Sequence, residues 1–124
     1  MNDAKYSYKN LDVYKEAKVL VMMVYGLLKH FPKEEQYALC DQLRRAVISV
    51  PSNVAEGSGR TSMKDQAHFL EIAFASLQEV ECQMDIAHDL DYITQGELYT
   101  INTQISRVAA MLSGLRRKRL EENR

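Results

Sequence analysis

Apolar residues recur every three or four positions through the first part of the chain. In residues 10–31 the spacing is a strict 3-4-3-4-3, on Tyr14, Ala17, Val21, Val24, Leu28 and Phe31. This spacing places all six on one side of an α-helix that packs lengthwise against others. Asn10 is a residue type that caps helix starts and Pro32 would stop a helix, so we expect a first helix over residues 10–31. Residues 1–9 are polar and aperiodic, which predicts an arm.

A second helix is expected after Pro32, with Glu34 and Glu35 in its first turn, where negative side chains suit the helix dipole. Its inward stripe is Leu39, Leu43, Ala46, Val47, Val50 and Val54. Pro51 interrupts this stripe; because proline lacks an N–H and crowds the carbonyl four residues earlier, we expect a kink there. A glycine-rich stop beginning at Gly57 predicts a left-handed C-cap.

Two capping boxes predict the remaining helices. Ser62 with Asp65 would open the third helix and Thr94 with Glu97 the fourth. Their heptad stripes are Leu70, Ala73, Leu77, Val80, Met84 and Ala87, then Leu98, Ile101, Ile105, Val108, Leu112 and Leu115. Four long helices joined by short turns predict an all-α fold, an antiparallel up-down-up-down four-helix bundle. We expect residues 1–124 to form a single domain, with a charged tail at 116–124.

The first predicted helix is also apolar on the side away from its stripe, at Val19, Met22, Met23, Tyr25 and Gly26. A helix without a polar face in so small a domain has to bury its back against something. Another copy of the chain would serve, which predicts a homo-oligomer with these five residues at its interface. The alternative is a central helix covered by its own neighbours.

Charge is unevenly distributed, although the formal net charge is only −1. Residues 64–91 hold seven acids against Lys64, and bases dominate after Gln104. The candidate nucleic-acid contacts are Arg107, Arg116, Arg117, Lys118 and Arg119. Repeated around an oligomer, this block would bind a phosphate backbone with steep salt dependence. Arginines at a helix C-terminus also complement the helix dipole, and that role alone would explain them.

Four polar residues of the second helix, Arg45, Ser49, Asn53 and Glu56, fall on one stripe. Arg45 and Glu56 are too far apart along the axis to pair with each other, so each needs a partner elsewhere. One interpretation is structural: Arg45 pairs with Glu79, while Ser49 and Asn53 satisfy backbone groups freed by Pro51. The other is a polar groove for an RNA or protein partner.

The string QLRRAVISVPSNVAEGSGR, preceded by FPKEEQYAL and followed by FLEIAFASLQEVE, resembles the four-helix bundle proteins encoded in 23S ribosomal RNA intervening sequences. The residues that carry the resemblance are Gln42, Arg44, Arg45, Ser49, Asn53, Ala55, Glu56, Gly57 and Arg60. The resemblance implies small bundles that assemble as rings, with pentamers the best-known form, and no enzymatic activity. More distantly similar are accessory variability proteins of retroelements, which bind a reverse transcriptase and nucleic acid.

Enzymatic chemistry has little support in the sequence. The Asp65–His68 and Asp85–His88 pairs have metal-ligand spacing but lie on one predicted helix, about 30 Å apart at helical rise, so they cannot share an ion. Cys40 has no evident histidine partner, and neither has Cys82, so we expect two reduced thiols. No apolar run is long enough for a membrane span. We therefore expect a cytoplasmic, non-enzymatic protein without cofactors.

The expected function is that of a homo-oligomeric RNA-binding or ribonucleoprotein accessory factor. Its partners would be its own copies, most readily as a pentamer, and structured RNA or a nucleic-acid enzyme. The alternative is a protein–protein interaction scaffold with no nucleic-acid role.

Overall fold

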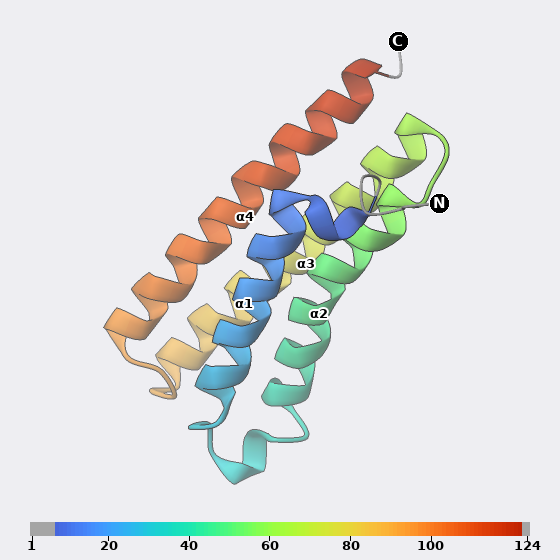
Figure 1. Cartoon of the computed structure of the whole chain (residues 1–124). Coiled ribbons are helices and arrows are strands. Elements are labelled where there is room, and N and C mark those ends of the chain that lie inside the picture. Colours follow the sequence, from blue (N-terminus) through green and yellow to red (C-terminus); the bar gives the residue numbers. More distant parts are fainter. Residues whose placement is uncertain (1–6, 123–124) are drawn as a thin grey trace.

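The computed structural model describes residues 7–122, and over this range the chain is all-α with no strand (Figure 1). Its four long helices are α1 (Asp12–Leu28), α2 (Leu39–Ser58), α3 (Met63–Asp89) and α4 (Gln95–Glu122). Short 3-10 turns, η2 (Tyr8–Asn10) and η3 (Lys33–Glu35), precede α1 and α2. The predicted all-α class with four helices is confirmed. Most of the predicted N-terminal arm lies outside the described residues, and the predicted tail at 116–124 continues α4 as far as Glu122.

Each long helix packs against two others. α2 lies between α1 and α3, α4 also contacts both of these helices, and within residues 7–122 no Cα atoms of α1 and α3 lie within 8 Å of each other. α1 and α3 therefore occupy diagonal positions. Gln42 contacts Gln83, and further along α2 Ser49 contacts Ser76. Residue numbers therefore rise along α2 as they fall along α3, which means that these two helices run in opposite directions.

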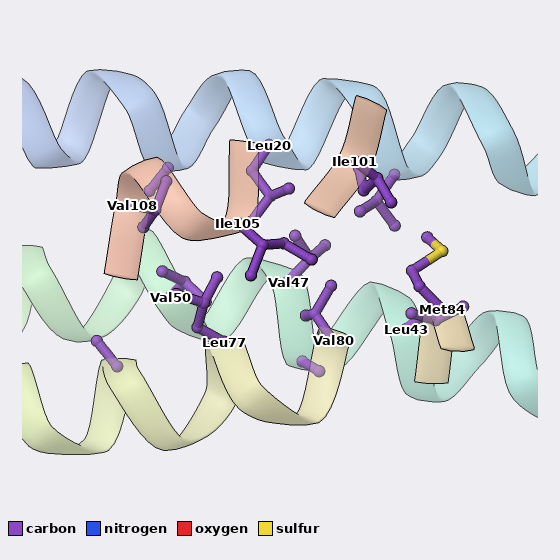
Figure 2. Packing of buried hydrophobic residues seen from close by; sticks show 14 of the residues in the cluster. Leu20, Leu43, Val47, Val50, Leu77, Val80, Met84, Ile101, Ile105 and Val108 are labelled. Carbon is purple, nitrogen blue, oxygen red and sulfur yellow. The ribbon is translucent and has the colours of Figure 1, made fainter. Parts of the chain in front are cut away.

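One hydrophobic core runs between the four helices (Figure 2). The six predicted core residues of α3 are all buried, as are five of the six predicted for α4. The exception is Leu115, which is partly buried because α4 runs past the start of α1 at this end (Figure 1). Burial of such side chains is the main favourable term in folding, so these stripes fix how α3 and α4 face the core.

α1 differs from its prediction in its start and in its buried side. The helix begins at Asp12, and Asn10 instead ends the turn η2, which Ser7 caps by accepting a 3.1 Å bond from the Lys9 amide. The buried residues of α1 are Val13, Ala17, Leu20, Val24 and Leu28, while Tyr14 and Val21 are only partly buried. The stripe is rotated because α1 packs against both α2 and α4 and presents a wider apolar side than a single seam.

The start of α2 was predicted too early. Pro32 precedes the separate turn η3, and α2 begins only at Leu39. Ala38 interrupts helical geometry between the two, with φ −124° and ψ −100°. Pro51 lies inside α2, which stays helical through it, and a kink there remains a prediction. Its predicted inward stripe is buried except at Leu39, which is partly buried.

Gly57 has a different role from the one predicted. α2 continues to Ser58, and the capping Gly59 has right-handed geometry, with φ −85°. No described glycine has positive φ, so the left-handed C-cap was wrong. A Cβ on Gly57 would lie 2.8 Å from the Cβ of Phe69 and 3.3 Å from the Gln66 carbonyl oxygen. Glycine is required because α2 and α3 approach closely here.

Both predicted helix starts in the second half of the chain are confirmed. The Ser62 hydroxyl accepts a 2.9 Å bond from the Asp65 amide at the start of α3. Thr94 and Glu97 exchange bonds of 2.9 Å and 3.1 Å at the start of α4, the reciprocal capping box. Asp91, with φ 63°, makes the left-handed residue of the tight turn between α3 and α4.

Candidate interaction surfaces

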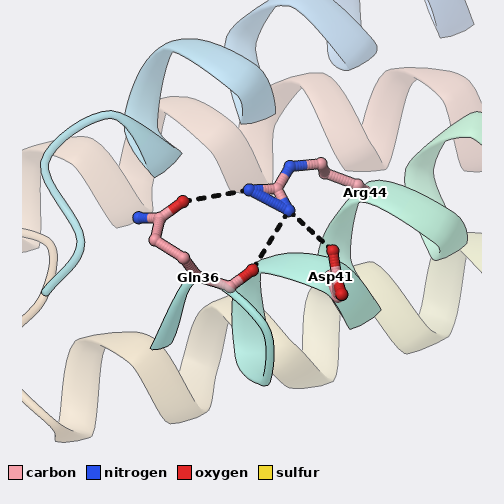
Figure 3. A network of polar contacts seen from close by, with 3 residues as sticks. All are labelled: Gln36, Asp41 and Arg44. Carbon is pink, nitrogen blue, oxygen red and sulfur yellow. Dashed lines mark hydrogen bonds and ion pairs between the residues drawn. The ribbon is translucent and has the colours of Figure 1, made fainter. Parts of the chain in front are cut away.

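The string QLRRAVISVPSNVAEGSGR, which we call the motif, spans most of α2 and the turn after it. Its Arg44 holds the loop before α2 in place (Figure 3). One guanidinium nitrogen donates to the Gln36 carbonyl at 3.3 Å and to Asp41 at 2.9 Å, and the other donates to the Gln36 side chain at 3.0 Å. The planar guanidinium supplies several donors in a fixed fork, which suits three acceptors at once. Arg44 therefore fixes the path of the chain between η3 and α2.

Ser49 and Asn53 link α2 to α3. The hydroxyls of Ser49 and Ser76 are 2.8 Å apart, and the Asn53 amide donates to the Ser49 carbonyl at 2.8 Å and to its hydroxyl at 2.9 Å. The interpretation that these two residues satisfy the carbonyl freed by Pro51 is not confirmed. The backbone carbonyl that receives the amide belongs to Ser49, whereas the missing N–H of Pro51 would free that of Val47.

The predicted ion pair between Arg45 and Glu79 is not formed. Glu79 accepts a 3.2 Å bond from Gln83, whose amide also donates to Gln42 at 3.3 Å. Arg45 is exposed and makes no ion pair within residues 7–122. Arg45 and Glu79 lie at the same level along the helix axes. The side chains that contact each other between α2 and α3 at this level are instead the neutral pair Gln42 and Gln83.

Glu56 finds its partner in the turn after α2. Its carboxylate is 2.9 Å from the Arg60 guanidinium, which also lies over the Phe69 ring at 4.6 Å. The Arg60 carbonyl accepts a 2.8 Å bond from Gln66. Arg60 thus joins α2, the turn and α3, and the inference that Glu56 needs a partner on a distant element was wrong.

The motif has a set of seven polar residues, formed by the polar stripe together with Gln42, Arg44 and Arg60. This set therefore serves largely to hold the chain's own elements together. Six of its seven residues, Gln42, Arg44, Ser49, Asn53, Glu56 and Arg60, bond to other groups of the same chain. Among the described residues only Arg45 of this set leaves its charge uncompensated and exposed. A groove for a partner along this stripe stays a prediction.

The basic block of α4 is partly neutralised within the chain. Arg107 pairs with Glu16 at 3.4 Å, Arg116 with Glu71 at 3.1 Å and Arg119 with Glu122 at 3.4 Å. Arg117 and Lys118 are exposed and make no ion pair with any described residue. They are the two members of the block whose charge is fully available to an external anion.

The side of α1 that faces away from the core is exposed and apolar. Val19 is 45%, Met22 73% and Tyr25 38% exposed, Gly26 is exposed as well, and Met23 is partly buried against the core. Two grooves flank this surface. One, of about 590 Å³, lies between α1 and α2, and the other, of about 690 Å³, between α1 and the start of α4. Met22 lines both grooves, so the other elements within residues 7–122 do not cover this side of α1.

Two further polar contacts were not predicted from the sequence. The Gln104 amide donates to the Glu16 carboxylate at 3.0 Å, and this bond, with the nearby Arg107, lowers the pKa of Glu16. The Tyr92 hydroxyl donates to Glu35 at 2.7 Å, which raises the pKa of Tyr92 and ties the α3–α4 turn to η3. Burial raises the pKa of the Cys40 thiol, while Cys82 is exposed, and both are free. None of these pairs has a regular spacing in the sequence.

Residues 7–122 contain no cluster of three or more histidine, cysteine, aspartate or glutamate side chains that could hold a metal ion. Over the same range no helix has both the length and the apolar content needed to cross a membrane. Two exposed surfaces stand out among the described residues: an apolar side of α1 and two unpaired cations near the end of α4.

These features define a small all-α protein whose most distinctive polar residues hold its own helices together. The chain belongs to the 23S rRNA-intervening sequence protein family, whose model matches residues 9–114. No curated protein matches it. It is similar in fold to the crystal structure of a protein of unknown function from the S23 ribosomal protein family of Bacteroides thetaiotaomicron. The TM-score is 0.77 at 20% identity, and the match covers 83% of this chain and 96% of that one.

Proposed function

We propose that this protein is a non-enzymatic, cytoplasmic four-helix bundle that assembles from identical copies and binds structured RNA as an accessory factor. We infer an antiparallel up-down-up-down bundle, supported by the opposite numbering of the α2–α3 contacts and by the short turns. The family name connects these proteins with ribosomal RNA, and that connection is the reason for preferring RNA to other anions.

The main support for assembly from identical copies is that the outer side of α1 is apolar and exposed. Its centre is apolar and exposed at Met22, and a Cβ on Gly26 would meet nothing within 4 Å. A glycine inside a helix costs about 1 kcal/mol relative to alanine. Nothing in the described chain accounts for that cost at Gly26, whereas close approach of a neighbouring copy would. A pentameric ring is the form that the family resemblance favours.

RNA binding is supported by the distribution of charge along the molecule. Arg117 and Lys118 lie at the end that holds the α2–α3 turn, whereas no Lys or Arg occurs between Lys64 and Arg107. Any approach of a phosphate backbone is therefore favoured at one end. Repetition of two unpaired cations in every copy would raise both affinity and salt dependence.

The alternative is a protein-binding scaffold without a nucleic-acid role. Its supporting observation is that Glu16, Glu71 and Glu122 already pair with three of the five basic residues. Under this alternative, the basic block serves mainly to hold α4 in place.

The RNA proposal is tested by titrating structured ribosomal RNA fragments at several salt concentrations. Arg117→Glu with Lys118→Glu should weaken binding and make its dependence on salt shallower by about one unit of slope per lost phosphate contact. Lys29→Glu with Lys33→Glu is the matched control, because it makes the same change in charge at the opposite end. Equal losses in the two variants, or salt-independent binding by the intact protein, would favour the scaffold.

Assembly is tested by light scattering on the intact protein, on Met22→Glu and on Gly26→Ala. Met22→Glu should dissociate the oligomer because it places a charge at the centre of the apolar surface. Gly26→Ala should weaken assembly while stabilising the dissociated chain by up to about 1 kcal/mol. A monomeric intact protein would refute the homo-oligomer.

A further inference from the structure

The groove between α1 and α2 has an apolar centre and a basic edge. Val19 and Met22 of α1 and Ile48 of α2 line it, with Lys15 and Lys18 beside them. Both lysines are exposed, and neither makes an ion pair within residues 7–122. Lys18 lies 5.1 Å from the centre of the Tyr14 ring, which holds its side chain along this edge. The groove suits a helix that is apolar along its centre and acidic at its margins.

The outer face of α3, which we define as Glu79, Cys82, Ile86 and Asp89, has that chemistry. Spacings of three, four and three residues place these side chains on one stripe, and all four are exposed. Ile86 is 44% exposed. Glu79 makes no ion pair among the described residues, and the nearest basic side chain that pairs with Asp89 there is the His88 imidazole at 4.0 Å. The whole stretch from Asp65 to Ser106 contains no Lys or Arg, so Lys64, at the start of α3, is far along the helix from both acids.

We propose that the outer face of α3 of one copy docks into the α1–α2 groove of the next copy. This inference rests on the proposed homo-oligomer and identifies the second surface of its interface. Ile86 and Cys82 would cover Val19, Met22 and Ile48, with the acids of α3 beside Lys15 and Lys18. Complementary charge would fix the register and the orientation of the two helices.

The two surfaces can act at the same time in every chain. α1 and α3 occupy diagonal positions, with no Cα atoms within 8 Å of each other, so occupation of the groove leaves the outer face of α3 free for another copy. A contact between two different surfaces is heterologous: it forms a closed ring when the rotation between successive copies closes and an open filament when it does not. Because the groove lies to one side of α1, each copy would be turned relative to the one before, as a ring requires.

A second copy is preferred to a foreign acidic helix as the occupant for two reasons. The outer face of α3 is present wherever the groove is, at the same concentration. Ile86 on this face is also exposed within the described chain, so a single contact between copies would bury both Ile86 and the apolar groove. A foreign helix would account for the groove alone.

The test is a charge exchange measured by light scattering. Lys15→Glu with Lys18→Glu makes the groove acidic, and Glu79→Lys with Asp89→Lys makes the α3 face basic. Each variant alone should need at least about tenfold more protein to assemble than the intact chain, because like charges face each other. A single chain that carries all four changes should assemble like the intact chain, since every acidic groove then meets a basic α3 face whatever the number of copies in the ring. Glu34→Lys with Glu121→Lys adds the same charge outside both surfaces and should assemble normally.

The outcomes separate this inference from the homo-oligomer on which it rests. If both charge variants assemble like the intact chain while Met22→Glu dissociates it, the oligomer stands and the α3 contact is wrong. If the two charge variants dissociate and the chain with all four changes does not assemble, the pairing of these two surfaces is likewise refuted. If the intact protein is monomeric, the homo-oligomer itself fails. Far-ultraviolet circular dichroism of each variant identifies loss of fold, and a variant that is folded and monomeric counts for the proposal only when the chain with all four changes assembles again.

Discussion

Gly57→Ala tests whether close approach of α2 and α3 is what requires glycine at the end of α2. The new Cβ would lie 2.8 Å from the Cβ of Phe69 and 3.3 Å from the Gln66 carbonyl oxygen. The first distance is shorter than carbon atoms tolerate, and both neighbouring atoms belong to the backbone or sit directly on it. Neither can rotate away as the tip of a long side chain would, so α2 and α3 have to move apart.

Two effects of opposite sign set the size of the change. Replacing a helical glycine by alanine favours the helix by about 1 kcal/mol. Overpacking of a well-packed contact costs about 1–3 kcal/mol, and a clash with fixed atoms belongs at the upper end of that range. We therefore expect a net loss of about 1–2 kcal/mol in the free energy of unfolding. For a chain of this size, that loss corresponds to a decrease in Tm of about 4–8 °C.

Urea denaturation followed by circular dichroism, at one fixed protein concentration, measures this loss. Gly114→Ala is the matched control, because its Cβ would meet only the Arg117 guanidinium, at 3.9 Å. That variant should gain up to about 1 kcal/mol from helix propensity. If Gly57→Ala is as stable as Gly114→Ala, the close approach does not constrain the fold and the reasoning is wrong. Phe69→Ala should not rescue Gly57→Ala, since alanine keeps the Cβ that makes the contact.

Three further changes test the polar contacts. Asn53→Ala should lower the free energy of unfolding by about 1 kcal/mol in urea denaturation, because it removes both amide bonds to Ser49, whereas the exposed neighbour Ser52→Ala should change it little. The pKa of Tyr92 is raised in the folded state, so its stabilising contribution is present below the unfolded pKa of about 10 and is lost as the pH rises through the folded value. Tyr92→Phe should therefore reduce the alkaline loss of stability in a pH series. The pKa of Glu16 is lowered, so its contribution is present above the unfolded pKa of about 4.3 and is lost as the pH falls through the folded value. Glu16→Gln should show a shallower acid transition than the intact chain, and an unchanged transition would contradict a role for the Gln104 bond.

The sequence predicts α3 and α4 well because their signals are local. The capping side chains of Ser62 and Thr94 bond to backbone groups three residues away, so a stretch of four residues suffices to predict each start. α1 was harder to orient, since Leu20 and Val21 are both apolar and spacing alone cannot decide which faces the core. Contact with both α2 and α4 decides it, and that contact is a property of the whole fold.

The start of α2 and the partners of the polar stripe depend on long-range geometry. Arg44 reaches back eight residues to Gln36, and the conformation of Ala38 separates η3 from α2. The predicted pairing of Arg45 with Glu79 had the right height along the helix axis and the wrong rotation about it. Gln42 and Gln83 face each other across α2 and α3, which leaves Arg45 to point outward.

The division between scaffold and surface bears directly on function. The motif of α2 is a sequence signature of this fold because Arg44, Asn53 and Arg60 make hydrogen bonds within the same chain that stabilise its loops and helices. A side chain that is occupied in this way is a poor anchor for a partner, since binding would first have to break the internal bond. Apart from Arg45, the side chains free for binding lie outside the motif, on the exposed side of α1, the outer face of α3 and the last turns of α4. Variants in the motif should therefore act first on stability, and variants in these three surfaces on assembly and RNA binding.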